Sequence, residues 1–379
     1  MSRRENCQVC GLPRSLNRKL VWTTDGGIYF QSKHSDRLLF LEEEDISTII
    51  ADAVKLRGDD VLDRLRDIRR DFTRAAVSSQ IAGMRRFFFR HWPLAKRIVK
   101  SAFQDAAFFG CGDINISKIS PRKQMIAKAR HPYHPHLLAG DIWGFWEGLY
   151  GVEAELALNA SSHLECDITV TTKQKRKRKA SDEKMPERPK RDYDLEVCEK
   201  CHLPLFPWEL RWDTELGTIY LAGTHRHMTI TSVQGWRLIL NEIKRAMGEE
   251  YPAIMSEALS DKAAAKYRLI KDDNYKTAYR HFFLGLPFLG WGKPSKVARK
   301  PFLVEADMEG VPFPQLLAWK IKGAYQALEN EPGDIEYYKT GSEKWQYLIG
   351  PQLDGTFLEI DKFKPVGIQN TYPRPFLTF

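Results

Sequence analysis

The sequence has few cysteines and no long apolar run, and each shortage narrows the class of protein. Six cysteines in 379 residues are too few for a fold held together by disulfides. No apolar stretch approaches the ~18 residues that a membrane-spanning helix needs, and no apolar signal core follows Met1. We therefore expect a cytoplasmic protein with no membrane partner, whose cysteines are reduced thiols or metal ligands.

Familiar catalytic signatures are missing as well. The chain has no Walker loop, no GxSxG elbow, no HExxH and no dinucleotide fingerprint. The acidic run at 42–45 is typical of a solvated turn. A loop with the sequence RHPYHPH holds His131, His134 and His136, and a proline-fixed loop is its plain interpretation. We expect a protein that is not an enzyme; catalysis at this histidine loop is the alternative.

Positive charge is concentrated in one segment. Residues 173–191 hold ten Lys/Arg and three Asp/Glu, whereas the whole chain has a net charge of +9. We interpret 171–194 as a solvated linker that cannot bury a core. A second hypothesis uses this linker and the arginine-rich helix expected at 61–77 to bind nucleic acid, but the small charge of the remaining chain makes nucleic acid the less favoured partner.

Two similar cysteine pairs, CQVCGLP at 7–13 and CEKCHLP at 198–204, stand 191 positions apart. A CxxC turn lets two thiolates reach one metal ion, but it supplies only half of a four-cysteine site. We favour one zinc site shared by Cys7, Cys10, Cys198 and Cys201. An iron–sulfur cluster on the same four thiolates is the alternative cofactor.

Two other interpretations of the cysteine pairs stay open. In one, each pair closes its own site with nearby residues, His34 and Asp36 in the first half and His225 and His227 in the second. In the other, no metal binds and the thiols pack in the core. A shared metal would join the two halves and contribute to folding directly.

The cysteine pairs open two segments with the same succession of patterns. LVWTTDGGIYF and LRWDTELGTIYL each predict a β-hairpin. FFGCG at 108–112 matches FLGWG at 288–292, and HLLAGDIWGFWEGLYG matches QLLAWKIKGAYQALEN, with strands expected after each. We therefore expect an α+β fold built by internal duplication: a first domain at 1–170, the linker, a second domain at 195–350, and an extended arm at 351–379.

The second part of each segment resembles the V4R (4-vinyl reductase) domain, which is related to the TRAPP subunits. The resemblance is carried by Gly110, Gly112, Leu137, Leu138, Gly140, Gly144 and Gly148, and by Gly290, Gly292, Leu316, Leu317 and Gly323. It implies an α/β fold with a pocket for a hydrophobic small molecule, often beside zinc. The family's cysteines after this helix are reduced to Cys166 here. We expect two such domains, each preceded by its CxxC hairpin, arranged as a pseudo-dimer.

Aromatic side chains near the two glycine turns are the candidates for pocket lining. Ordinary core packing is their other interpretation. The candidate ligand-binding residues are Phe109, Cys111, Trp143, Trp146, Trp291, Trp319 and Tyr325. With the arm at 351–379 as a site for a protein partner, we expect either a sensor or carrier of a hydrophobic molecule or an accessory subunit of an enzyme complex.

Overall fold

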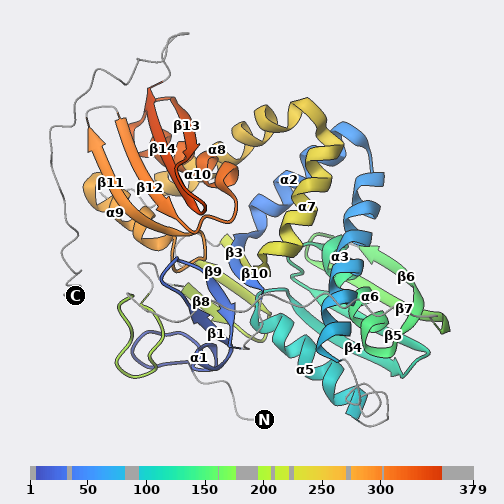
Figure 1. The fold of residues 1–379 in the computed structure, drawn as a ribbon. Coiled ribbons are helices and arrows are strands. Elements are labelled where there is room, and N and C mark those ends of the chain that lie inside the picture. The colour runs from blue at the N-terminus through green and yellow to red at the C-terminus, as the bar shows by residue number, and fades with distance from the viewer. Residues whose placement is uncertain are drawn as a thin grey trace.

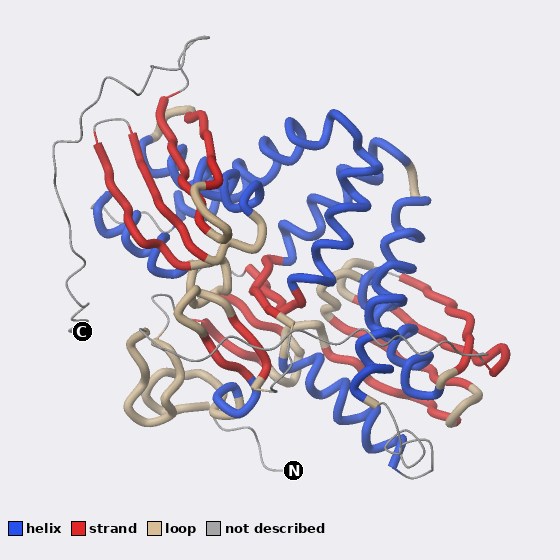
Figure 2. Tube along the Cα trace, in the orientation of Figure 1, coloured by secondary structure: helices blue, strands red, loops and turns tan. Residues whose placement is uncertain are grey.

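The computed structural model describes residues 6–31, 36–81, 94–160, 162–175, 195–205, 210–221, 226–269, 275–300 and 303–351. These residues form a mixed α/β fold with three antiparallel sheets (Figure 1). Figure 2 shows the strands in three separate groups, with helices between and alongside them. The expected α+β class is therefore confirmed at this level. Residues 352–379 of the arm expected at 351–379, and most of the linker, lie outside the described residues.

A six-stranded sheet at the centre contains strands from both halves of the chain. The first half supplies β1 (Leu20–Trp22), β2 (Ile28–Phe30) and β3 (Arg37–Glu42); the second supplies β8 (Leu210–Asp213), β9 (Thr218–Leu221) and β10 (Arg226–Ser232). The strand order is β1-β2-β3-β10-β9-β8. Strands β3 and β10 pair antiparallel, with Phe40 opposite Ile230. The two hairpins thus meet in one continuous sheet.

Each outer sheet has four strands from one half only. The first consists of β4 (Asp113–Ser120), β5 (Gln124–Arg130), β6 (Val152–Ala160) and β7 (Glu165–Lys175), in the order β4-β5-β7-β6. The second consists of β11 (Lys293–Lys300), β12 (Leu303–Glu309), β13 (Gly333–Lys339) and β14 (Lys344–Pro351), in the order β11-β12-β14-β13. The order of strands is therefore the same in both.

The long helices that follow the strands of the central sheet also come in one order in the two halves, apart from the short α1 and η1. The first has α1 (Leu16–Lys19), α2 (Glu43–Arg57), α3 (Asp60–Gln80), α5 (Leu94–Phe108) and α6 (Pro135–Tyr150). The second has α7 (Val233–Met247), the short η1 (Gly248–Glu250), α8 (Tyr251–Leu269), α9 (Tyr275–Gly285) and α10 (Pro314–Glu329). Long helices pack closely at glycines: a Cβ on Gly144 would lie 2.2 Å from the Arg70 carbonyl oxygen, and one on Gly323 2.2 Å from that of Ser260.

Each hairpin docks on the glycine turn of the other half. A Cβ on Gly26 would lie 2.4 Å from the carbonyl carbon of Gly292, and one on Gly217 would lie 2.3 Å from that of Gly112. Both Gly26 and Gly217 have positive φ, so a side chain there would strain the backbone as well as clash. The two sequence segments therefore exchange their hairpins, so that each compact unit of sheet and helices contains residues from both.

Candidate metal centre

The two cysteine turns adopt the same local structure. In the first, the Cys7 amide donates to the Leu12 carbonyl at 2.7 Å and the Gly11 amide to the Cys7 carbonyl at 2.9 Å. In the second, the Cys198 amide donates to the Leu203 carbonyl at 2.8 Å, and His202 takes the place of Gly11. Both Gly11 and His202 have positive φ, the conformation that closes such a tight turn. Each turn consequently holds its two thiols toward one point.

The two turns meet, and all four sulfur atoms converge. The Sγ atoms of Cys7 and Cys198 are 3.7 Å apart, and those of Cys10 and Cys201 are 3.4 Å apart. All four Sγ atoms lie within 4.8 Å of one another. A tetrahedral ion with metal–sulfur distances of about 2.3 Å separates its ligand sulfurs by about 3.8 Å. The cluster therefore has the ligands and the size to hold one metal ion, as expected.

Neighbouring side chains fix the approach of the two turns. Asn17 of α1 donates its side-chain amide to the Cys201 carbonyl at 3.0 Å, and Lys200 donates to the Gln8 side chain at 2.7 Å. Three of the four cysteines are buried, and Cys10 is half-buried. A metal here would join the start of the chain to the start of the second half.

Without a cation, the pKa values of the Cys7, Cys10 and Cys201 thiols are shifted in opposite directions. The backbone amide of Cys10 lowers the pKa of the Cys7 thiol to about 6, against the opposing effect of burial. Burial raises the pKa of Cys10 and of Cys201. A bound cation would favour the thiolate form of all four, because metals bind cysteine as thiolate. Metal binding is thus expected to release protons.

The alternative of two separate sites does not match this arrangement, because the cysteines of both turns share one cluster. His34 and His225 lie outside the described residues. Asp36 accepts a hydrogen bond from the Ser232 hydroxyl, and His227 pairs with Glu43 at 3.4 Å between Nδ1 and Oε2. Neither Asp36 nor His227 belongs to the cysteine cluster.

The candidate ligand-binding residues take different places in the fold. Trp146 and Tyr325 are fully buried, and Trp146 donates its indole N–H to the Thr172 hydroxyl at 3.0 Å. Trp143 lies against the Arg70 guanidinium, 4.0 Å from the ring centre. Trp291 alone of the seven lines one of the cavities described below. The remaining three, Phe109, Cys111 and Trp319, pack in or against the apolar core.

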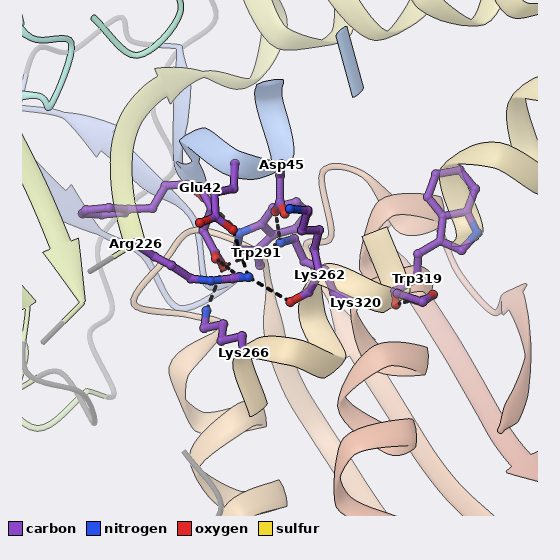
Figure 3. A network of polar contacts seen from close by, with 11 residues as sticks. Glu42, Asp45, Arg226, Lys262, Lys266, Trp291, Trp319 and Lys320 are labelled. Carbon is purple, nitrogen blue, oxygen red and sulfur yellow. Dashed lines mark hydrogen bonds and ion pairs between the residues drawn. The ribbon is translucent and has the colours of Figure 1, made fainter. Parts of the chain in front are cut away.

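A small cavity between the two halves is lined by charged groups as well as by aromatic rings. Its polar wall is formed by Glu42, Asp45, Arg226, Lys266 and Lys320, shown in Figure 3. Its apolar wall includes Phe40, Tyr267 and Trp291. The free space is about 20 Å³, enough for one water molecule. The side chains of the protein itself thus fill most of this site.

The charges around that cavity are paired across the two halves. Glu42 accepts from Arg226 Nη1 and Lys266 Nζ, each at 2.8 Å, and Lys320 pairs with Asp45. Burial acts to raise the pKa of Glu42, but the three cations outweigh it and hold that pKa well below its usual range. The interpretation of 42–45 as a solvated turn was wrong for Glu42 and Asp45: both are buried, because β10, α8 and α10 cover them.

Burial lowers the pKa of two histidines of the histidine loop, His134 and His136. Burial lowers the pKa of His134 to about 3, and Nδ1 of His134 has no hydrogen-bond partner. His131 lies 6.2 Å from His227 between ring centres. The hydrogen bond that His227 donates to the Glu43 carboxylate raises the pKa of His227, while burial raises that of Glu43. This pair can hold a proton, but among the described residues it lines none of the cavities found.

Arginines of α3 are occupied by internal ion pairs. Arg69 binds Asp141 through two hydrogen bonds of 2.9–3.0 Å, and Arg70 binds Glu147 in the same way. Arg74 also contacts Glu147, at 3.1 Å. These side chains therefore hold α3 to α6 instead of presenting free cations to a nucleic acid.

A large open groove of about 1120 Å³ lies beside α5 and β4. Lys96, Lys100 and Lys118 line it together with Phe103 and Ile116, and residues 214–215 of the second half border it. It is a surface groove rather than an enclosed pocket for a small molecule. None of the seven candidate ligand-binding residues lines it.

Comparisons with known proteins give no match, so the site is interpreted from its geometry. No protein family, no curated protein and no solved structure matches the chain. Among the described residues, no helix is long and apolar enough to cross a membrane. The cysteine cluster was found from sequence, whereas the buried partners Arg226, Lys266 and Lys320 were missed. The sequence held one signal for Lys320: in the alignment of the two matching helices, this lysine stands opposite Asp141, so the position has opposite charges in the two halves.

Proposed function

We propose that Cys7, Cys10, Cys198 and Cys201 bind one zinc ion, and that this ion joins two copies of a duplicated, V4R-like domain into a non-catalytic pseudo-dimer. The observation that carries the proposal is the convergence of four Sγ atoms within 4.8 Å from two turns 191 residues apart. Cysteine-only tetrahedral sites are typical of structural zinc. The zinc would contribute to the stability of the join between the halves.

The size of the cluster favours a single ion over an iron–sulfur cluster. In a four-iron cluster each cysteine binds a different iron, so the sulfurs stand farther apart than around one ion. The cross-pair separations of 3.4 and 3.7 Å suit one tetrahedral centre without rearrangement. Mononuclear iron has the same geometry, and its visible colour distinguishes it from colourless zinc.

As the role of the joined domains we propose a cytoplasmic accessory subunit that binds a protein partner. Two observations support this version over a sensor or carrier of hydrophobic molecules. The cavity beside Trp291 has room for about one water molecule, and Trp146 and Tyr325 are closed into the core. The large hollow is an open surface groove, which suits an extended partner.

Metal content per chain tests the proposal. Elemental analysis and a visible spectrum of untagged, anaerobically purified protein should give one colourless zinc. Cys7→Ser and Cys198→Ser should each remove the whole zinc, since both turns serve one ion. Cys166→Ser, a buried cysteine of β7 outside the cluster, is the control and should keep it. Two zincs, with each variant losing one, would overturn the shared site.

A second measurement separates the accessory subunit from the carrier. The accessory version predicts that denaturing mass spectrometry of natively purified protein finds no stoichiometric small molecule. A hydrophobic molecule released at one per chain would favour the sensor or carrier instead. This result is independent of the zinc count, so the two parts of the proposal can fail separately.

A further inference from the structure

The contact between the two halves is electrically different on its two sides. Here the first half means the described residues within 6–175, and the second half those within 195–351. We infer that the buried charges of each half fit only the unlike half, so that neither half can pair with a second copy of itself. This inference goes beyond the proposed function and does not depend on which metal, if any, binds the cysteines.

Strands β3 and β10 define which positions correspond. Phe40 and Ile230 face each other in the antiparallel register, and each donates its backbone amide to the glycine turn of the other half: Phe40 to the Leu289 carbonyl at 2.9 Å, Ile230 to the Phe109 carbonyl at 2.8 Å. Phe40 and Ile230 are therefore equivalent positions. Counting outward from them, two residues onward, Glu42 corresponds to Ser232.

The same count places Asp36 in correspondence with Arg226, four residues before the central pair. On one side of the sheet Arg226 donates to Glu42 at 2.8 Å. On the other side the Ser232 hydroxyl donates to the Asp36 carboxylate. The contact on one side is therefore an ion pair. The equivalent contact on the other side is a hydrogen bond from a neutral hydroxyl to a carboxylate.

The helices beside the sheet extend this difference. Lys320 is the seventh residue of α10 and Asp141 the seventh of α6. Lys320 reaches Asp45 of the first half, whereas Asp141 is bound within its own half by Arg69 and Tyr133. The position that corresponds to Asp45 is Gly235, which has no side chain to offer. Among the described residues, the charged network at Glu42 and Asp45, shown in Figure 3, thus has no equivalent at Ser232 and Gly235, and the ion pair of Arg64 with Glu242 is a separate contact between the halves.

Pairing of like halves would leave buried charges without partners. Two first halves would bring Glu42 against Asp36, carboxylate to carboxylate. Two second halves would bring Ser232 and Gly235 against the cations that now bind Glu42 and Asp45, namely Arg226, Lys266 and Lys320. Buried charges that lack a partner are strongly unfavourable, and such mismatches exclude wrong partners. The fitting partner is the unlike half, whether in the same chain or exchanged with a second copy of it.

Substitutions that change the charges at Ser232 and Asp36 in the full chain test this pairing preference directly. Ser232→Glu should lower the melting temperature, because it places a carboxylate against Asp36. Ser232→Gln, of the same size but neutral, is the matched control and should lower it less. Adding Asp36→Arg to Ser232→Glu copies the Arg226–Glu42 pair onto this side and should recover part of the loss. Equal melting temperatures for the Glu and Gln variants, or no recovery in the double variant, would overturn the inference.

A second experiment tests pairing itself. The full chain with a specific protease site placed between residues 176 and 194 is purified and then cleaved. Cleaved samples with and without an isotope label are mixed, unfolded in urea and refolded with zinc, and native mass spectrometry identifies the pairs. Unlike pairs of both label combinations, without like pairs, are expected. Like pairs of either half at comparable abundance would overturn the inference.

Discussion

Trp22 donates its indole N–H to the carbonyl oxygen of Phe288, 266 residues further along the chain, at 3.0 Å. Trp212 makes the matching bond to Phe108, at 3.2 Å. Each tryptophan belongs to the hairpin of one half and each acceptor to the glycine turn of the other. These two bonds mark the exchange of hairpins that makes the halves depend on each other.

Trp22→Phe should reduce the free energy of unfolding by about 1–2 kcal/mol, because the ring stays apolar while one buried hydrogen bond is lost. Urea unfolding measures the change. Trp212→Phe is the matched variant on the other side and should cost a similar amount. A variant as stable as the parent would contradict a structural role for the Trp22 bond.

Gly26→Ala should destabilise the protein more than Gly58→Ala. Both glycines have positive φ, but a Cβ on Gly26 would lie 2.4 Å from Gly292, whereas nothing lies within 4 Å of one on Gly58. Backbone strain alone costs about 1–3 kcal/mol, and the clash should add about 1–3 kcal/mol at Gly26. Thermal or urea unfolding compares the two; equal losses would show that the hairpin does not dock as described.

Glu42→Gln should cost about 3–5 kcal/mol of unfolding free energy, since it removes the anion that binds Arg226 and Lys266 in a buried site. Glu44→Gln is the control. Glu44 also contacts Arg226, at 3.0 Å, but its side chain is 47% exposed, so its loss should cost less than about 1 kcal/mol. Urea titration of both variants decides; similar small losses would mean that the network contributes little.

Removal of the metal should lower the melting temperature of the parent protein. The ligands come from residues 191 positions apart, so the ion stabilises the folded state and has no comparable site in the unfolded chain. Differential scanning fluorimetry with and without a chelator measures the shift. Cys7→Ser, already without metal, should not respond to the chelator, and a response there would point to another metal site.

The contribution of His227 to stability should decline as the pH rises. Glu43 raises the pKa of His227 in the folded state, so the charged imidazole is favoured on folding. The full contribution is present below the unfolded-state pKa of about 6.5 and is lost as the pH rises through the higher folded-state pKa. His227→Gln should therefore cost up to about 1 kcal/mol near pH 5.5.

The same substitution should cost least near pH 8.5, where the imidazole is neutral in both states. His163→Gln, at an exposed loop position, is the control and should show no such trend. Unfolding curves at a series of pH values measure both variants. A cost for His227→Gln that grows with pH would contradict the assigned pair.

Local chemistry allowed the cysteine turns, the glycine turns and the helix that begins at Pro135 or Pro314 to be predicted from sequence. CxxC spacing, positive-φ glycines and apolar periodicity are properties of a few consecutive residues. Their recurrence at matching intervals also favoured one shared cysteine site. The convergence of Cys7 with Cys198 agrees with this prediction. The spacing of the cysteines alone also allowed a separate metal site for each pair.

Only the tertiary structure decided which half each hairpin packs against and which charged side chains are buried. Glu42 and Asp45 are typical of a solvated turn when taken with their neighbours in sequence. They are buried because β10, α8 and α10 close over them. Their countercharges Arg226, Lys266 and Lys320 all belong to the second half, 184–275 positions further along the chain. A buried charge is stable only beside its partner, and sequence neighbours do not reveal a partner that the fold brings from so far away.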